Sequence, residues 1–224
     1  MMDLEIILKN IQNVKVIDSN IDYSEYIPLD LSISNIELQK INLQDSSNFE
    51  IFIDNYLQKN NSKVAFGGYN EERNIYKRSP IFKSKEIEER NIHIGLDLWI
   101  HSGTRVLSAL DGVIHSYKYN KGIGNYGTTI ILKHDIQSHV FYTLYGHLSK
   151  KSIENIEIGK EFKKGGLIAT LGNSSENGDY APHLHFQIIK NMEDFFGDYP
   201  GVCSKNKLDF YLKNCPNPNL LLKL

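Results

Sequence analysis

The sequence has few cysteines, no long apolar run and no excess of basic charge. Its two cysteines, Cys203 and Cys215, lack the CxxC spacing of a zinc pair, so they are either free thiols or the ends of one loop-closing disulfide. No stretch approaches the roughly 20 apolar residues of a membrane-spanning helix. Lys plus Arg total 25 against 27 for Asp plus Glu, a net charge of -2. This balance argues against nucleic-acid binding, which requires a basic surface.

The amino terminus lacks the pattern of a secretory signal. Asp3 and Glu5 stand where a basic region is required, and Lys9 and Asn10 interrupt the apolar run. We therefore expect a cytoplasmic location, unless the chain is exported by another route or is numbered as a mature form. With 41% hydrophobic and 23% charged residues, the composition is that of an ordinary soluble globular protein.

The chain divides by composition into three segments. Residues 1–62 are rich in Ile, Asn, Leu and acidic side chains, whereas residues 63–190 alternate apolar and polar positions between glycine turns. Residues 191–224 form an irregular strap that ends in an apolar anchor at residues 220–222. We expect a helical cover or adaptor segment, a β domain, and a strap packed on that domain, respectively.

One helix is predicted within the first segment. Ser46 or Ser47 is a suitable N-cap. The polar run at residues 59–62 ends the helix. Its apolar residues recur at helical spacing, and they are Phe49, Phe52, Ile53, Tyr56 and Leu57.

The middle segment carries the two-residue period of β-strands. Apolar residues at 94, 96, 98 and 100 alternate with the residues at 93, 95, 97 and 99. Further strands are predicted at residues 64–66, 106–108, 113–119, 128–133 and 140–148. Residues 103–113 and 158–168 resemble each other, each running strand, turn, strand. Short strands at this spacing favour an all-β sandwich or barrel, and no βαβ pattern supports a parallel doubly wound fold.

Three motifs place histidines inside otherwise apolar strands. They are HIGLD at residues 93–97, YGHLS at residues 145–149 and PHLHF at residues 182–186. Burying a polar ring nitrogen is costly unless something binds it. Zinc is a suitable partner, because imidazole and carboxylate are among its usual ligands.

Strand geometry limits how these side chains meet. His183 and His185 share one face of a strand, with Cα atoms roughly 6.6–7 Å apart, so both can address one site. His93 and Asp97 also share a face, but a straight strand would separate their Cα atoms by roughly 13 Å. That span is too long for chelation of one ion. We therefore predict a kink or bulge at Gly95.

A site with three protein ligands keeps a fourth position for water, which is typical of catalytic rather than structural zinc. Zinc lowers the pKa of that water and polarises a substrate carbonyl. A neighbouring neutral histidine can accept the proton of the water, and a protonated one can support the developing oxyanion. His147 and one histidine of the PHLHF motif, His183, suit these two tasks, and the sequence does not say which performs which.

The ordered set HIGLD, YGHLS and PHLHF resembles the lysostaphin/LytM-type M23 metallopeptidases, whose signatures are H-x-x-x-D, a histidine in a Y-x-H-L strand, and H-x-H. The segment from Gly103 to Val113 also matches the G-T-x-V…D-G-x-V strand pair of that family. Carried over by position, the resemblance implies one zinc ion per chain, and it covers roughly residues 66–190. The implied metal ligands are His93, Asp97 and His185, and the implied catalytic pair is His147 and His183.

The resemblance also implies a fold and an activity. The fold is mainly β with antiparallel sheets, of the duplicated hybrid-motif or barrel-sandwich type, behind a helical N-terminal segment. The activity is zinc-dependent endopeptidase cleavage of stem or cross-bridge peptides in peptidoglycan. The segment before PHLHF, residues 173–182, is longer and more acidic than the usual family turn, so we expect a different substrate preference.

Two other functions compete with this prediction. One is a non-catalytic LytM-like module that binds cell wall or regulates a hydrolase, although such modules typically lose ligands that this chain keeps. The other is a zinc hydrolase of a cytoplasmic peptide or amide, which the missing signal would favour. Asn70 could approach the zinc as a plugging ligand, but a surface turn is the simpler interpretation. Structural roles are expected for His101, His115, His134 and His139.

Overall fold

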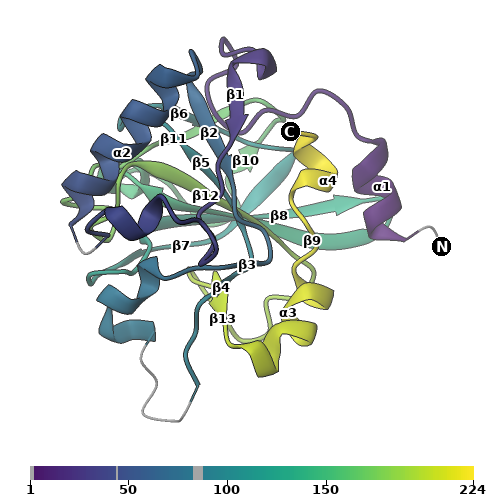
Figure 1. Ribbon diagram of the computed structural model, residues 1–224. Coiled ribbons are helices and arrows are strands. Elements are labelled where there is room, and N and C mark those ends of the chain that lie inside the picture. Colours follow the sequence, from purple (N-terminus) through teal and green to yellow (C-terminus); the bar gives the residue numbers. More distant parts are fainter. Residues whose placement is uncertain (1–2, 44, 83–87) are drawn as a thin grey trace.

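The computed structural model describes residues 3–43, 45–82 and 88–224 (Figure 1). Among them, eight strands form the main sheet in the order β1-β2-β5-β12-β9-β8-β7-β10. Neighbouring strands are antiparallel, except that β1 runs parallel to β2. The strands are β1 (Tyr26–Pro28), β2 (Val64–Gly67), β5 (Leu96–Trp99), β7 (Gly112–Asn120), β8 (Gly127–Ile136), β9 (His139–Leu148), β10 (Glu161–Phe162) and β12 (His183–Ile189). The predicted mainly antiparallel β fold is confirmed.

Two smaller sheets complete the β structure of the described residues. A three-stranded sheet contains β3 (Glu71–Glu72), β4 (Ile92–His93) and β13 (Val202–Cys203), with β4 in the middle. A two-stranded sheet pairs β6 (Arg105–Leu107) with β11 (Leu167–Thr170). The two segments that resemble each other in sequence therefore pair in space. The first segment contains β6 and the start of β7, which pair with β11 and β10 of the second segment, respectively.

The main sheet is covered on both faces. Every residue of β12 is buried, so its alternation separates an apolar core face with Leu184, Phe186 and Ile188 from a buried face with His183, His185 and Gln187. On β5, Leu96 and Leu98 face a cluster that includes residues of α1 (Leu4–Asn10) and α4 (Asn219–Leu222). Trp99 faces a second cluster with Phe49 of α2 (Ser46–Lys59). Figure 1 shows α1 and α4 together and α2 on the other side of the molecule.

The N-terminal segment is helical in part. The predicted helix exists as α2, but its N-cap is Asp45, whose side chain accepts a hydrogen bond from the Ser47 amide. Ser46 instead donates its hydroxyl to Asp179 over 2.6 Å. The same segment also supplies β1, which extends the main sheet. Among the described residues, none of the helices has the length and apolar character needed to cross a membrane.

The C-terminal segment is more regular than the predicted irregular strap. It contains β13, α3 (Leu208–Asn214) and α4, whose Leu221 and Leu222 are buried as the apolar anchor predicts. Cys203 and Cys215 are free and buried. Of the two alternatives for the cysteines, the structure therefore supports free thiols. Burial raises the pKa of Cys203 to about 11 and that of Cys215 to about 12, so neither is a ready nucleophile.

Candidate metal centre

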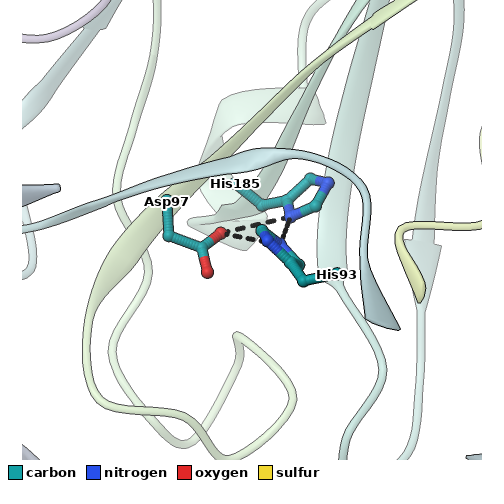
Figure 2. Close-up of side chains that lie close together, drawn as sticks. All are labelled: His93, Asp97 and His185. Atoms are coloured by element: carbon teal, nitrogen blue, oxygen red, sulfur yellow. Dashed lines mark hydrogen bonds and ion pairs between the residues drawn. The ribbon is translucent and has the colours of Figure 1, made fainter. Parts of the chain in front are cut away.

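Three buried side chains converge at the junction of the main sheet and the three-stranded sheet (Figure 2). His93 lies on β4, Asp97 on β5 and His185 on β12. Nε2 of His93 is 2.8 Å from Nδ1 of His185. Oδ1 of Asp97 is 3.2 Å from each of these two nitrogens. The predicted ligand residues are thus brought together around one point.

The backbone between His93 and Asp97 bends, as predicted. β4 belongs to one sheet and β5 to another, and the bend falls at Gly95. Asp97 pairs directly with His185 across the antiparallel strands β5 and β12. Gly95 also allows a close approach, because a Cβ atom at this position would lie 2.4 Å from Cε1 of His185. Glycine therefore permits the close approach of the His185 ring to the backbone at the bend.

The outer nitrogen of each ligand histidine donates to a fixed acceptor. Nδ1 of His93 is 2.8 Å from the carbonyl oxygen of Gly68, and Nε2 of His185 is 2.9 Å from Oε1 of Gln187. Both partners are acceptors, so these two nitrogens carry the protons of the neutral rings. The nitrogens that face each other, Nε2 of His93 and Nδ1 of His185, therefore present lone pairs.

This arrangement is repulsive unless a cation lies among the three atoms. Two nitrogen lone pairs and one carboxylate oxygen point at one another with no proton to share. With zinc bonds of about 2 Å, tetrahedral ligand atoms would be about 3.3 Å apart, close to the 2.8–3.2 Å observed. The set of two imidazoles and one carboxylate fits a zinc ion.

The other two predicted histidines flank this cluster. The rings of His147 and His183 have centroids 4.1 Å apart, and Nε2 of His183 is 3.9 Å from Oδ1 of Asp97. Nδ1 of His147 donates to the carbonyl of Asn177 over 2.7 Å, and Nδ1 of His183 donates to that of Ala181 over 2.8 Å. Each ring therefore keeps an unprotonated Nε2.

His147 has an unusual backbone conformation. Its φ is 62°, in the left-handed region that residues other than glycine rarely adopt. Its amide donates to Tyr126 over 3.0 Å, and its carbonyl accepts from Gly172 over 2.9 Å. Neighbouring segments thus hold the strained residue in place, and such strain is commonly found at functional sites.

Burial favours the neutral form of three histidines of the site. It lowers the pKa of His93 and that of His183 to about 4. Burial and the adjacent His183 lower the pKa of His147 well below its ordinary value. Burial would raise the pKa of Asp97, but interactions with His93, Arg73 and His183 outweigh it and hold that pKa well below its ordinary value. At neutral pH, Asp97 is therefore a carboxylate beside the neutral imidazoles of His93, His147 and His183.

Comparison with known protein families matches residues 91–195 to peptidase family M23. The chain carries an M23 peptidase domain. The match contains all five predicted site residues. Residues 1–90 and 196–224 lie outside it.

Two named relatives of the M23 domain are endopeptidases. The chain is 32% identical over 99 residues to the peptidoglycan DD-endopeptidase ShyC of Vibrio cholerae, covering 44% of this chain and 20% of that protein. It is 28% identical over 132 residues to the L-Ala--D-Glu endopeptidase of Bacillus subtilis, covering 55% and 38%. The chain thus spans well under half the length of these relatives. The catalytic domain of lysostaphin from Staphylococcus simulans is 26% identical, with 68% and 93% covered and a TM-score of 0.38.

Two supporting residues of the M23 domain site were not predicted. Gln187 follows His183 and His185 on the same strand face, so the alternation along β12 could have indicated it. Arg73 is 2% exposed, and its Nη1 donates to Oδ2 of Asp97 over 2.6 Å. It precedes Asp97 by 24 residues in a polar stretch, and no local pattern sets it apart.

The site residues line one pocket of about 210 Å³. Trp99 stacks on His183, with ring centroids 3.9 Å apart, so this core residue also forms part of the pocket wall. Tyr76, Phe82 and Tyr199, which lie outside the residues matched to the M23 family, contribute further walls. The pocket is therefore shaped by segments before and after the matched region.

The residues assigned structural roles lie outside this cluster. His134 is buried between the carbonyl of Asp111, 2.8 Å away, and the hydroxyl of Thr143, 2.7 Å away. His101 is exposed, and His115 and His139 are half-buried. Asn70 is an exposed turn residue with a φ of 57°, which agrees with the surface-turn interpretation.

Proposed function

We propose that this chain is a zinc-dependent endopeptidase that hydrolyses peptide bonds in the stem or cross-bridge peptides of peptidoglycan. One zinc ion per chain is held by Nε2 of His93, Oδ1 of Asp97 and Nδ1 of His185. The observation that carries the proposal is the convergence of these three atoms within 3.2 Å of one another. Support for a peptidoglycan substrate comes from the M23 domain and from the names of its relatives.

Zinc, when bound, would lower the pKa of water and polarise a substrate carbonyl. His147 and His183 supply the proton chemistry, since each has an unprotonated Nε2 beside the cluster. One accepts the proton of the attacking water, and the resulting imidazolium lies where it can later protonate the leaving amine. The other stabilises the developing charge on the carbonyl oxygen. The carbonyls of Asn177 and Ala181 keep both rings in the required tautomer.

A second candidate is hydrolysis of a small peptide or amide. The observation that favours it is the depth of the site, because none of the five side chains exceeds 5% exposure. The additional walls from Tyr76, Phe82 and Tyr199 restrict the space beside the cluster. A cross-linked polymer requires a more open approach than a small substrate does. A non-catalytic module is less consistent with a complete set of five site residues.

The test is the release of new amino groups from purified peptidoglycan by the zinc-loaded protein. Wild type should release them, whereas Asp97→Ala should not. His139→Ala is the matched control, because this half-buried histidine lies outside the site, and it should behave like wild type. Equal release by wild type and Asp97→Ala would contradict the ligand assignment. Release from short soluble peptides only would favour the second candidate.

A further inference from the structure

Arg73 connects the metal centre to the rest of the protein through two buried ion pairs. Its Nη1 donates to Oδ2 of Asp97, and its Nε donates to Oε2 of Glu71. The Arg73 side chain is 2% exposed and that of Glu71 is 13% exposed. Arg73 lies outside residues 91–195, so the match to the M23 family says nothing of it.

We propose that Arg73, held by Glu71, is a positioning residue that fixes Asp97 for metal binding. The inference rests on the proposed zinc centre. A carboxylate has two oxygens and can turn about its side-chain bonds to offer either one, or both, to an ion. Arg73 occupies Oδ2, so Oδ1 is the oxygen left to face His93 and His185.

The charge-assisted bond also holds the Asp97 carboxylate in place. At 2.6 Å, the contact between Nη1 and Oδ2 is as short as strong ionic hydrogen bonds become. A buried arginine is costly without such partners. Nη2 of Arg73 has no hydrogen-bond partner among the described residues, so this cost is only partly offset. A buried, incompletely bonded arginine contributes little to stability. Its position beside Asp97 therefore favours a role in metal binding.

Glu71 is in turn held by the N-terminal segment. Its Oε1 accepts the Leu31 amide over 3.1 Å. The Ile33 amide donates to the carbonyl of Glu72 over 2.9 Å, which anchors the same strand, β3. Contacts therefore run from Leu31 through Glu71 and Arg73 to Asp97. The segment at residues 1–62, predicted as a helical cover or adaptor, supports the geometry of a metal ligand.

Arginine and glutamate suit these positions for geometric reasons. The planar guanidinium donates to both carboxylates at once, and the single ammonium of lysine does not reproduce that fork. Glu71 accepts one hydrogen bond on each oxygen, from Leu31 and from Arg73. Glutamine has only one acceptor oxygen, so Glu71→Gln removes one of the two bonds without changing the size of the side chain.

The experiment compares zinc affinity among Glu71→Gln, Arg73→Lys, the double variant and Glu72→Gln. Glu72 is the matched control, because it is the exposed neighbour of Glu71 on β3 and its side chain bonds to Asn91. The zinc dissociation constant is measured by competition with a chelator. The visible spectrum of the cobalt(II)-loaded protein and the thermal unfolding of the metal-free protein are recorded alongside.

Glu71→Gln and Arg73→Lys should each weaken zinc binding by about 10-fold or more, as changes to outer partners of metal ligands do. They should also alter the cobalt(II) spectrum. The double variant should bind zinc no more weakly than whichever single variant binds it less tightly. Glu71 and Arg73 act on Asp97 through the same series of contacts, so their effects should not add. Glu72→Gln should match wild type in both measurements.

Wild-type zinc affinity and an unchanged cobalt(II) spectrum in folded Glu71→Gln would overturn the proposal. The Glu71→Gln variant can decide this even if Arg73→Lys fails to fold. Glu71 does not touch Asp97, so it can affect zinc binding only through Arg73. A purely structural role would lower the unfolding temperature and leave both metal measurements unchanged. Failure of wild type itself to bind zinc would instead contradict the zinc centre, so the two failures are distinguishable.

Discussion

At the scale of single residues, each histidine of the site has one nitrogen bonded to an acceptor and one left free. The acceptors are the carbonyls of Gly68, Asn177 and Ala181 and the side chain of Gln187. These bonds fix the tautomer of each ring, and so they select the nitrogen that faces the cluster. The difference between a ligand and a proton carrier is then a matter of distance from Asp97 rather than of residue type.

The first prediction separates these roles. His147→Ala should retain zinc, because its ring lies outside the set of three converging atoms, yet turnover should fall by about 10²- to 10⁴-fold, the usual contribution of a general acid or base. His185→Ala should lose zinc as well as turnover. Metal content after dialysis and hydrolysis rate are measured together. Loss of zinc from a folded His147→Ala protein would show that this residue is a ligand and that the assignment is wrong.

The residue types of the site could be predicted from sequence, but their orientations could not. The motifs HIGLD, YGHLS and PHLHF placed five polar residues in apolar strands, where bound partners were expected, and the structure brings all five together. Whether Nδ1 or Nε2 faces the cluster depends on acceptors such as Gly68, which tertiary folding delivers. Arg73 was missed for the same reason. The ligand and catalytic roles stay predictions.

At the scale of secondary-structure elements, the site depends on the change of sheet between β4 and β5. Sequence spacing required a bend between His93 and Asp97, and Gly95 provides it. Long alternating strands such as β8 and β9 were also predictable. The short strands β1 and β13 were not, because two or three residues show no period and their pairing depends on distant segments. The N-cap of α2 was misplaced by one or two residues, since Asp, Ser and Thr are all suitable caps.

The second prediction concerns Gly95→Ala. The glycine has no positive φ, so alanine suffers no backbone strain, and the effect is steric contact with the His185 ring. Displacing that ring should weaken zinc binding. Gly112→Ala is a matched control, because its Cβ would lie 2.6 Å from Nδ1 of His134, a histidine outside the site. That variant should lose stability and keep wild-type zinc affinity. Unchanged zinc affinity in Gly95→Ala would contradict the claim that the missing Cβ at residue 95 makes room for the His185 ring.

At the scale of the whole molecule, all three parts of the chain contribute to the site or to the residues that support it. The M23 domain supplies the five predicted residues, the N-terminal segment supports Arg73 through Glu71, and the C-terminal segment pairs β13 with β4 beside His93. Composition indicated where the residue content and the apolar periodicity of the sequence change. It did not indicate that the outer segments contact residues in and around the site, because those contacts connect residues far apart in sequence. The boundaries at residues 62 and 190 stay predictions.

The third prediction follows from the buried neutral histidines. His93, His134 and His183 have pKa values of about 4 in the folded protein, against 6.5 for the ordinary side chain. Between these values the unfolded chain binds more protons than the folded one. The free energy of unfolding of the metal-free protein should therefore fall as pH drops from 6.5 to 4. Denaturant unfolding at several pH values measures it. Constant stability across that window would contradict the burial of neutral rings.

The most direct test of the central claim is anomalous X-ray scattering at the zinc edge from crystals of the zinc-loaded protein. We expect one peak per chain, in contact with Nε2 of His93, Oδ1 of Asp97 and Nδ1 of His185. His147 and His183 should lie beside the peak without binding it, and Oδ2 of Asp97 should remain on Arg73. A peak elsewhere, or one held by His147 in place of His185, would contradict the proposed centre.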